Sequence, residues 1–278
     1  MNAPRVLAVG LVLVAVLLSG CRHDDAVSPV ETAPPLARLR IIFPEGFTRR
    51  EMAERVGAVR EIAIRKRGVT PRLTTVGYRR ASARVVPPAE FRKDWSRSRS
   101  SEGFLFPATY EFTKLTTSEK LARDQLAYFR RQWRSADLRY AKSKNLTPYD
   151  VLIIASMIER ETVASEERRL VAAVIYNRLR NRMPLGIDAT IRYGRNVPGT
   201  EPLKQSDLES NSPYNTRLRL GLPPTPISNP GLASIRSAAR PARVDYLFFV
   251  RKPDGVHHFF TASESEFFQK KCEYGFGC

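Results

Sequence analysis

The sequence has few of the side chains that usually bind metal ions. It contains three cysteines and three histidines, His23, His257 and His258, in 278 residues. Structural zinc sites use about four such ligands at characteristic spacings, and no such spacing occurs here. We therefore expect no metal, and no other feature of the sequence calls for a cofactor.

Acidic residues are also scarce relative to basic ones. The chain has 46 Lys and Arg residues against 28 Asp and Glu, a formal net charge of +18. A positive charge of this size implies an anionic partner, such as nucleic acid, a lipid head group or an acidic polymer. The compartment in which the protein works decides among these partners.

Long apolar runs are lacking except near the N-terminus. One run, from Val6 to Leu18, follows Arg5 and precedes small residues and Cys21. It is too short for a mature membrane-spanning helix and has the layout of a secretory signal. Export makes nucleic acid an unexpected partner and leaves the anionic cell envelope, with its membrane surface and wall polymer.

The end of this segment resembles the bacterial lipobox, in which the cysteine is acylated and the preceding residues are removed. The motif here is Leu18-Ser19-Gly20-Cys21. We predict a lipoprotein signal peptide over residues 1–20, lipidation of Cys21 and a membrane-anchored protein of the cell envelope that faces outside the cytoplasm. An ordinary signal peptide, or a short helix with an incidental cysteine, is the alternative.

The other two cysteines, Cys272 and Cys278, lie in the C-terminal tail CEYGFGC. In an oxidising compartment two nearby cysteines joined by a Gly-containing loop could form a disulfide. We interpret the tail as structural.

The chain beyond the signal begins with a tether and a first folded portion. Residues 21–37 are polar and Pro-rich. Leu39, Ile41 and Ile42 predict a strand, and Thr48 predicts the N-cap of a helix that continues to about Lys66. Residues 72–88 are expected to be extended, and residues 89–101 to form a polar surface loop or ragged helix.

A helical centre is predicted next. Residues 118–144 form one predicted helix with an apolar face. Thr147 and Pro148 are strong start signals for a helix over residues 148–162, and a second helix is predicted over residues 165–182. A loop-rich stretch and a β-hairpin with an Asp254-Gly255 turn follow. The order predicts an α+β fold with a helical core, a small α/β N-terminal portion and a C-terminal hairpin.

Two acids, Glu159 and Glu161, end the most hydrophobic internal helix. Two residues on a helix point about 200° apart, so these carboxyls cannot share a pocket. Glu161 lies one turn after Met157 and Ile158, where loss of water would raise its pKa and keep it protonated as a general acid. The alternative is that both acids are exposed at a helix end.

Seven motifs occur in order and together resemble the YceG-like family of endolytic murein transglycosylases, a resemblance that extends from about residue 38 to residue 262. They are EGFLFPATYEF, ASMIERET, EERRLVAAVIYNRL, MPLGIDATIRYG, SPYNTR, GLPPTPISNPG and DYLFFV…GVHHF. The resemblance implies a reduced LysM-like subdomain over residues 38–88 and a catalytic domain over residues 89–278. The motif acid of the family corresponds to Glu161, in agreement with the helix-face argument.

The resemblance also implies the chemistry. The family cuts peptidoglycan strands internally between N-acetylmuramic acid and N-acetylglucosamine, leaves 1,6-anhydro ends and so terminates strands. Peptidoglycan glycan strands and the membrane are therefore the expected partners, and the family association suggests proximity to the cell-wall synthesis machinery. The rival functions are a non-catalytic peptidoglycan-binding lipoprotein and a muramidase-type hydrolase with Asp188 as a second carboxylate. A third rival, a nucleic-acid-binding protein, is supported only by the net charge.

Further substrate-binding residues are candidates from the same motifs. Asp188 matches an acid of the family and could equally cap a loop. Asn177 is either a satisfied core amide or a ligand of the sugar acetamide, and His257 either structural or functional. Tyr214, Asn215 and Thr216 could stack on and hydrogen-bond to sugars, or form a turn after Pro213.

The chain departs from the family pattern at its start, where a lipid anchor replaces the usual transmembrane helix. Gly186 replaces the family's glutamine two residues before Asp188. Four prolines, Pro223, Pro224, Pro226 and Pro230, are expected to stiffen a wall of the cleft.

Overall fold

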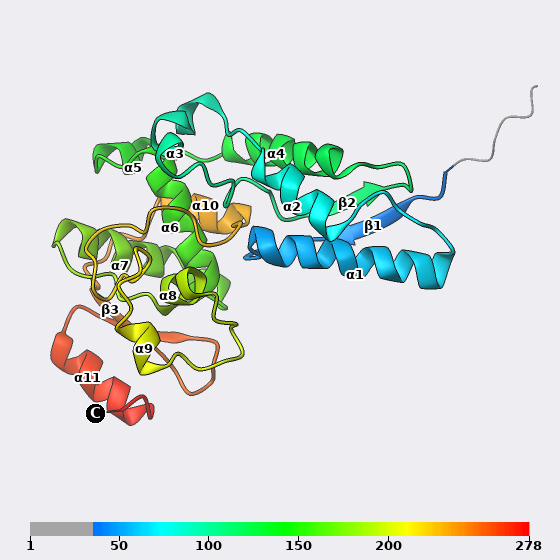
Figure 1. Ribbon diagram of the computed structural model, residues 1–278. Coiled ribbons are helices and arrows are strands. Elements are labelled where there is room, and N and C mark those ends of the chain that lie inside the picture. The colour runs from blue at the N-terminus through cyan, green and yellow to red at the C-terminus, as the bar shows by residue number, and fades with distance from the viewer. Residues whose placement is uncertain (1–35, 278) are drawn as a thin grey trace, which may run out of the picture. The chain divides into compact units, whose positions relative to one another are not determined.

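The computed structural model describes residues 36–277 (Figure 1). The predicted signal peptide, Cys21 and Cys278 lie outside the described residues, as does nearly all of the predicted tether. The described chain is α+β, with helices and two separate two-stranded antiparallel sheets. Among these residues no helix combines the length and the apolar character that crossing a membrane requires.

The first sheet holds together a hydrophobic cluster in the N-terminal portion. Its elements are β1 (Leu39–Ile42), α1 (Arg49–Arg67), α2 (Thr75–Ala83), β2 (Thr109–Phe112) and α4 (Ser118–Trp133). The predicted strand and first helix are confirmed. Thr48 begins α1 with a reciprocal capping box to Glu51, and Gly68 ends it in the left-handed conformation that glycine adopts without strain. This hydrophobic cluster contains residues from both predicted domains, residues 38–88 and residues 89–278.

The expectation of extended chain over residues 72–88 is wrong, because Thr75–Ala83 form helix α2. The side chain of Thr74 accepts a hydrogen bond from the Gly77 backbone and starts the helix. Tyr78 is fully buried, and its hydroxyl donates to Gln125 on α4. Packing against α1 and α4 therefore overrides the weak strand signal of this Thr- and Val-containing segment.

The segment after α2 forms η1 (Ala89–Phe91) and α3 (Arg92–Ser98), in accord with a ragged helix. The prediction of one helix over residues 118–144 is wrong in its second half, since α4 ends at Trp133 and a separate α5 spans Arg139–Ser143. Asp137 accepts a hydrogen bond from the Arg139 backbone at the start of α5.

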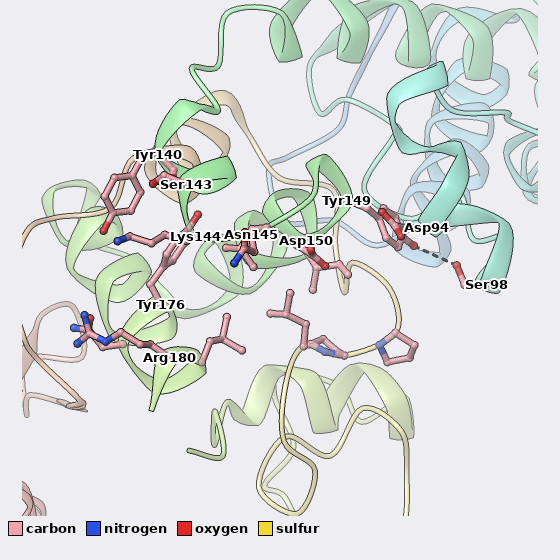
Figure 2. Close-up of a pocket in the computed structure, with 17 residues that line it drawn as sticks. Asp94, Ser98, Tyr140, Ser143, Lys144, Asn145, Tyr149, Asp150, Tyr176 and Arg180 are labelled. Carbon is pink, nitrogen blue, oxygen red and sulfur yellow. Dashed lines mark hydrogen bonds between the residues drawn. The ribbon is translucent and has the colours of Figure 1, made fainter. Parts of the chain in front are cut away.

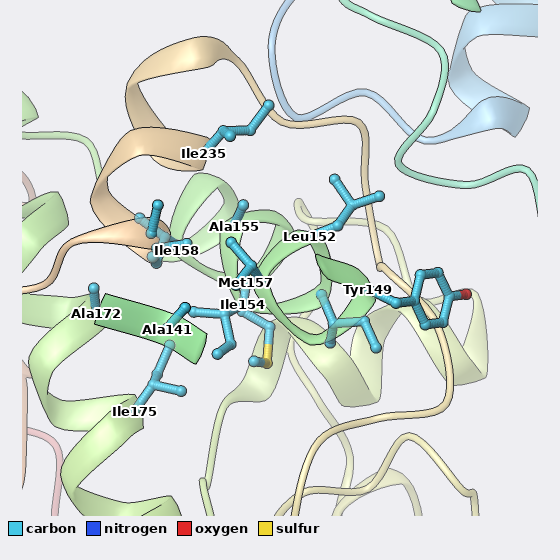
Figure 3. Close-up of a cluster of buried hydrophobic side chains, with 14 of the residues drawn as sticks. Ala141, Tyr149, Leu152, Ile154, Ala155, Met157, Ile158, Ala172, Ile175 and Ile235 are labelled. Atoms are coloured by element: carbon cyan, nitrogen blue, oxygen red, sulfur yellow. The ribbon is translucent and has the colours of Figure 1, made fainter. Parts of the chain in front are cut away.

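Helix α6 (Pro148–Glu161) lies at the centre of the larger hydrophobic cluster (Figure 3). Its predicted start is confirmed, since Thr147 forms a capping box with Asp150. The helix packs on α7 (Arg168–Arg180), which follows η2 (Ser165–Glu167), and on α10 (Leu232–Ala239). Figure 3 shows Ile154 and Ile158 of α6 among side chains of these neighbours. This burial fixes the position of the residues at the end of α6.

The stretch after α7 contains more helix than the sequence predicts. It forms α8 (Asp188–Arg195) and α9 (Gln205–Leu208) before α10. The predicted hairpin is confirmed as β3 (Phe248–Arg251) paired with β4 (His258–Thr261), with Arg251 opposite His258. The hairpin is not the last element, because α11 (Glu264–Glu273) follows and packs on it. Cys272 lies near the end of α11, and its pairing with Cys278 stays a prediction.

Candidate active site around Glu161

Glu161 is the last residue of α6, and its carboxyl is half-buried beside the start of α8. The backbone amide of Ala189 donates a hydrogen bond to it. The pKa of Glu161 is raised to about 7, mainly by loss of contact with water and next by the negative charge of Asp188, while the Ala189 amide, Arg251 and Arg160 act in the opposite direction. A carboxyl of this kind is close to half protonated at neutral pH and can give up a proton.

Glu159 contacts a different part of the molecule. Its Oε2 accepts a hydrogen bond from the Gly231 backbone at 2.8 Å, and its Oε1 lies 4.0 Å from Arg168 Nη2. The side chain is 6% exposed. Burial, followed by the charge of Glu159, raises the pKa of nearby Glu45. The two acids of α6 therefore point apart as helix geometry predicts, and the alternative of two exposed helix-end acids is wrong.

Asp188 is the first residue of α8 and is held by Arg217. The Arg217 Nε and Nη2 atoms each lie 2.8 Å from Asp188 Oδ1. Asp188 therefore starts a helix and also places a negative charge near Glu161. Both of the roles considered for it from sequence are compatible with this position.

The motif around Tyr214 orders the loop that precedes α8. Thr216 is buried, and its Oγ1 accepts a hydrogen bond from the Ile187 backbone at 3.0 Å. The buried amide of Asn215 donates to the carbonyl oxygens of Leu208 and Ser210. These contacts are turn chemistry that positions Asp188 and its neighbours.

Tyr214 is the more accessible member of this motif. Its hydroxyl is 2.8 Å from Thr225 Oγ1, and its ring meets the Tyr193 ring edge-on at 5.1 Å. One side of this aromatic pair is available to a ligand because both residues line a cavity of about 370 Å³. A sugar-binding role for this motif stays a prediction.

Asn177 and His257 lie elsewhere. The Asn177 amide donates to the carbonyl oxygens of Val244 and Tyr246, both at 2.9 Å, and so fixes the chain before the hairpin. His257 is exposed, with Nδ1 2.9 Å from Asp254 Oδ2, a contact that raises its pKa. Substrate contacts by either residue stay predictions.

Two buried polar groups were missed from the sequence. His258 Nδ1 lies 2.7 Å from Glu167 Oε2, and its backbone amide donates to the same carboxyl. Strand alternation puts His258 on the opposite face from His257, which is the one signal that could have separated them. The second group is Glu102, which opens the motif EGFLFPATYEF.

Glu102 is 3% exposed and accepts three hydrogen bonds. The donors are the Arg49 backbone at 2.8 Å, Asn229 Nδ2 at 2.7 Å and the Tyr193 hydroxyl at 3.2 Å. Burial raises the pKa of Glu102 to about 7 in spite of these donors. Its place in the motif is the only sequence signal, because its burial depends on chain segments far apart in sequence.

The largest cavity described, about 950 Å³, does not include Glu161 (Figure 2). It lies near the start of α6 and is lined by Tyr140, Tyr149, Tyr176 and Asn177, with Pro223 and Pro224 on one wall. Two of the four prolines expected to stiffen a cleft therefore line a cavity. The smaller cavity of about 370 Å³ is lined by Arg160 and Ala189, the immediate neighbours of Glu161.

Comparison with known proteins gives consistent results. The chain is 35% identical over 230 residues to an endolytic murein transglycosylase of Streptococcus pneumoniae (strain R6), covering 78% of this chain and 41% of that protein. It is 38% identical over 157 residues to the endolytic murein transglycosylase of Bacillus subtilis (strain 168), covering 55% and 42%. The chain thus spans about two fifths of the length of these curated relatives.

A crystal structure of a YceG-like protein from Listeria monocytogenes superposes with a TM-score of 0.67 at 25% identity, covering 86% of this chain and 77% of that one. The model of the YceG-like family matches residues 17–273, nearly the whole chain. A match of this extent, together with the fold and the motif order, places the chain in a family: it belongs to the YceG-like family.

Proposed function

We propose that this protein is an endolytic lytic transglycosylase of peptidoglycan with Glu161 as its catalytic residue. The observation that carries the proposal is a carboxyl with a pKa of about 7 at the end of a buried helix in a chain of this family. The relatives named endolytic murein transglycosylase support the same substrate. A group with this pKa is available both as an acid and as a base near neutral pH.

The proposed reaction uses one carboxyl twice. Protonated Glu161 gives its proton to the oxygen that links N-acetylmuramic acid to N-acetylglucosamine, and the bond from that oxygen to C1 breaks. The muramic 6-hydroxyl attacks C1, and its proton passes to the Glu161 carboxylate. The acid is restored, no water is consumed, and the new end is a 1,6-anhydro sugar. Asp188 and Arg251 would set the proton affinity of Glu161 through their charges.

A digest of purified peptidoglycan tests this proposal. The parent chain should release anhydro-ended fragments that mass spectrometry identifies, and Glu161→Gln should release none. Glu54→Gln, an exposed change of the same chemistry on α1, serves as the matched control and should act like the parent. Reducing ends instead of anhydro ends would indicate the hydrolase, for which the neighbouring Asp188 is the candidate second carboxylate. Sedimentation with the wall but no product from any variant would indicate a binding protein.

We also propose that the protein is anchored in the cell envelope by a lipid on Cys21 and works beside the cell-wall synthesis machinery. The lipobox-like sequence and the excess of positive charge support the anchor, because cationic surfaces associate with anionic membranes. Mass spectrometry of the N-terminal peptide should find acyl groups on Cys21, and Cys21→Ser should leave the protein unacylated. Cells that carry Glu161→Gln should make longer glycan strands than cells that carry the parent, and unchanged strand lengths would oppose the role as a terminator.

A further inference from the structure

A group of arginines surrounds the cavity of about 370 Å³ next to Glu161, here called the arginine pocket. They come from four helices that the fold brings together, with the first turn of α1 beside α6 (Figure 1). The arginines are Arg49 and Arg50 of α1, Arg79 of α2, Arg160 of α6 and Arg192 of α8.

None of these five guanidinium groups has its charge neutralised by an ion pair within residues 36–277. The arginine ion pairs of that part of the chain involve other residues, such as Arg168, Arg195 and Arg217. In four of the five, one guanidinium nitrogen instead donates a hydrogen bond to a neutral oxygen, as in the 2.7 Å hydrogen bond from Arg50 Nη1 to Asn196 Oδ1. Such contacts hold the side chains in place and leave most of their N–H groups for a ligand.

The two carboxyls of the pocket are already engaged. Glu51 accepts a hydrogen bond from the Thr48 backbone at 2.6 Å and completes the cap of α1. Glu102 accepts hydrogen bonds from the Arg49 backbone, Asn229 and Tyr193, and its pKa of about 7 leaves it with less than a full charge near neutral pH. The pocket is therefore positively charged. Planar guanidinium groups are suited to bind carboxylates and phosphates by paired hydrogen bonds.

The remaining wall of the pocket is apolar and aromatic. Val197, Pro198 and Ile227 lie there together with the rings of Tyr193 and Tyr214. A bare phosphate would leave this wall without a partner, whereas the end of a short peptide offers a carboxylate next to an alkyl group. The pocket also adjoins the reacting carboxyl, because Ala189 lines it while its backbone amide is bonded to Glu161.

We propose that the arginine pocket binds a carboxylate of the peptide stem carried by the muramic acid residue beside the bond that is cut. This inference rests on the proposed function, since it takes peptidoglycan as the substrate. It makes the peptide a determinant of where the strand is cleaved, with the stem seated between α1 and α8 and the sugar oxygen presented to Glu161.

Calorimetry on the full chain carrying Glu161→Gln tests the pocket without any turnover. The probes are a muramyl peptide with free carboxyls, the same peptide with its carboxyls amidated, and inorganic pyrophosphate. The free-acid peptide should bind, and the amidated form should bind at least about tenfold more weakly. Arg50→Gln and Arg79→Gln should each weaken binding about 3- to 10-fold; the Arg79 guanidinium makes no hydrogen bond within residues 36–277, so its loss disturbs no internal contact there. Arg130→Gln, the same charge change on α4, should have no effect.

Equal binding of the free and amidated peptides, or binding that Arg50→Gln and Arg79→Gln leave unchanged, would overturn the proposal. Tighter, arginine-dependent binding of pyrophosphate would overturn it in favour of a phosphate-bearing ligand. A parallel digest separates this inference from the catalytic one. If Arg79→Gln raises the KM for intact strands and leaves the KM for strands stripped of their peptides unchanged, the pocket recognises the peptide stem. If no strand is cleaved by the parent but peptide binding depends on Arg50 and Arg79, the catalytic proposal fails and the pocket stands.

Discussion

Asp188 is expected to set the pH at which Glu161 loses its proton. Burial is the main cause that raises the pKa of Glu161 to about 7, and the charge of Asp188 is the next. Asp188 is itself half-exposed and paired with Arg217 at 2.8 Å, which cancels part of its effect. We therefore assign to Asp188 about one pH unit of the pKa of Glu161, equivalent to about 1.4 kcal/mol.

Asp188→Asn removes that charge and should lower the pKa of Glu161 to about 6. The first step of the proposed reaction needs protonated Glu161, so activity should fall as pH rises through this pKa, and the alkaline limb of kcat/KM should move down by about one pH unit. At pH 7 the protonated fraction of Glu161 would fall from about a half to about a tenth, and the initial rate would fall about fivefold. The assay is the initial rate of anhydro-end formation from purified peptidoglycan between about pH 5 and pH 9.

Arg217→Gln is the matched opposite change. It leaves the Asp188 charge in place without its partner, so the pKa of Glu161 should rise and the alkaline limb should move to higher pH. If the alkaline limb of kcat/KM stays at the parent position in both Asp188→Asn and Arg217→Gln, or moves in the same direction in both, the charge of Asp188 does not set the pKa of Glu161. A loss of activity that is uniform across the pH range would assign Asp188 to positioning instead.

Three further predictions concern stability, each measured by denaturant unfolding. The pKa of Glu102 is about 7 when folded against an ordinary 4.5, so the folded state binds more protons and the free energy of unfolding falls by up to about 3 kcal/mol as pH rises between these values. Glu102→Gln should remove this loss, and an unchanged difference between pH 5 and pH 8 would contradict it. His258→Ala should cost about 2 to 4 kcal/mol because the buried Glu167 carboxyl loses the imidazole 2.7 Å away and keeps only the backbone amide of residue 258, whereas His257→Ala, on an exposed side chain, should change stability little. Gly103→Ala should cost at least about 2 kcal/mol, since φ is +89° and a proline ring lies 2.8 Å from the added Cβ; Gly199→Ala meets nothing within 4 Å and is the control.

Features that depend on a few neighbouring residues could be predicted from the sequence. Thr48 and Thr147 mark helix starts because a cap needs only a hydroxyl and an acid three residues later. The Asp254-Gly255 turn fixed the hairpin for a similar reason, since Gly255 takes a positive φ. The assignment of Glu161 rather than Glu159 followed from the angle between residues on one helix, together with the family motif.

Features that depend on distant segments required the tertiary structure. Thr74 supplies a local cap for α2, but residues 75–83 are fixed as a helix by the packing of Tyr78 and its neighbours against α1 and α4, which is not visible in the sequence. The pKa of Glu102 and the convergence of the five pocket arginines have the same origin, because burial and charge at one point are set by chain segments up to more than a hundred residues apart. The sequence by itself therefore determined the capped helix starts, the hairpin and the choice of Glu161 as the candidate acid, because each depends on neighbouring residues. The packing of distant segments decided the remaining elements and the electrostatic environment of that acid.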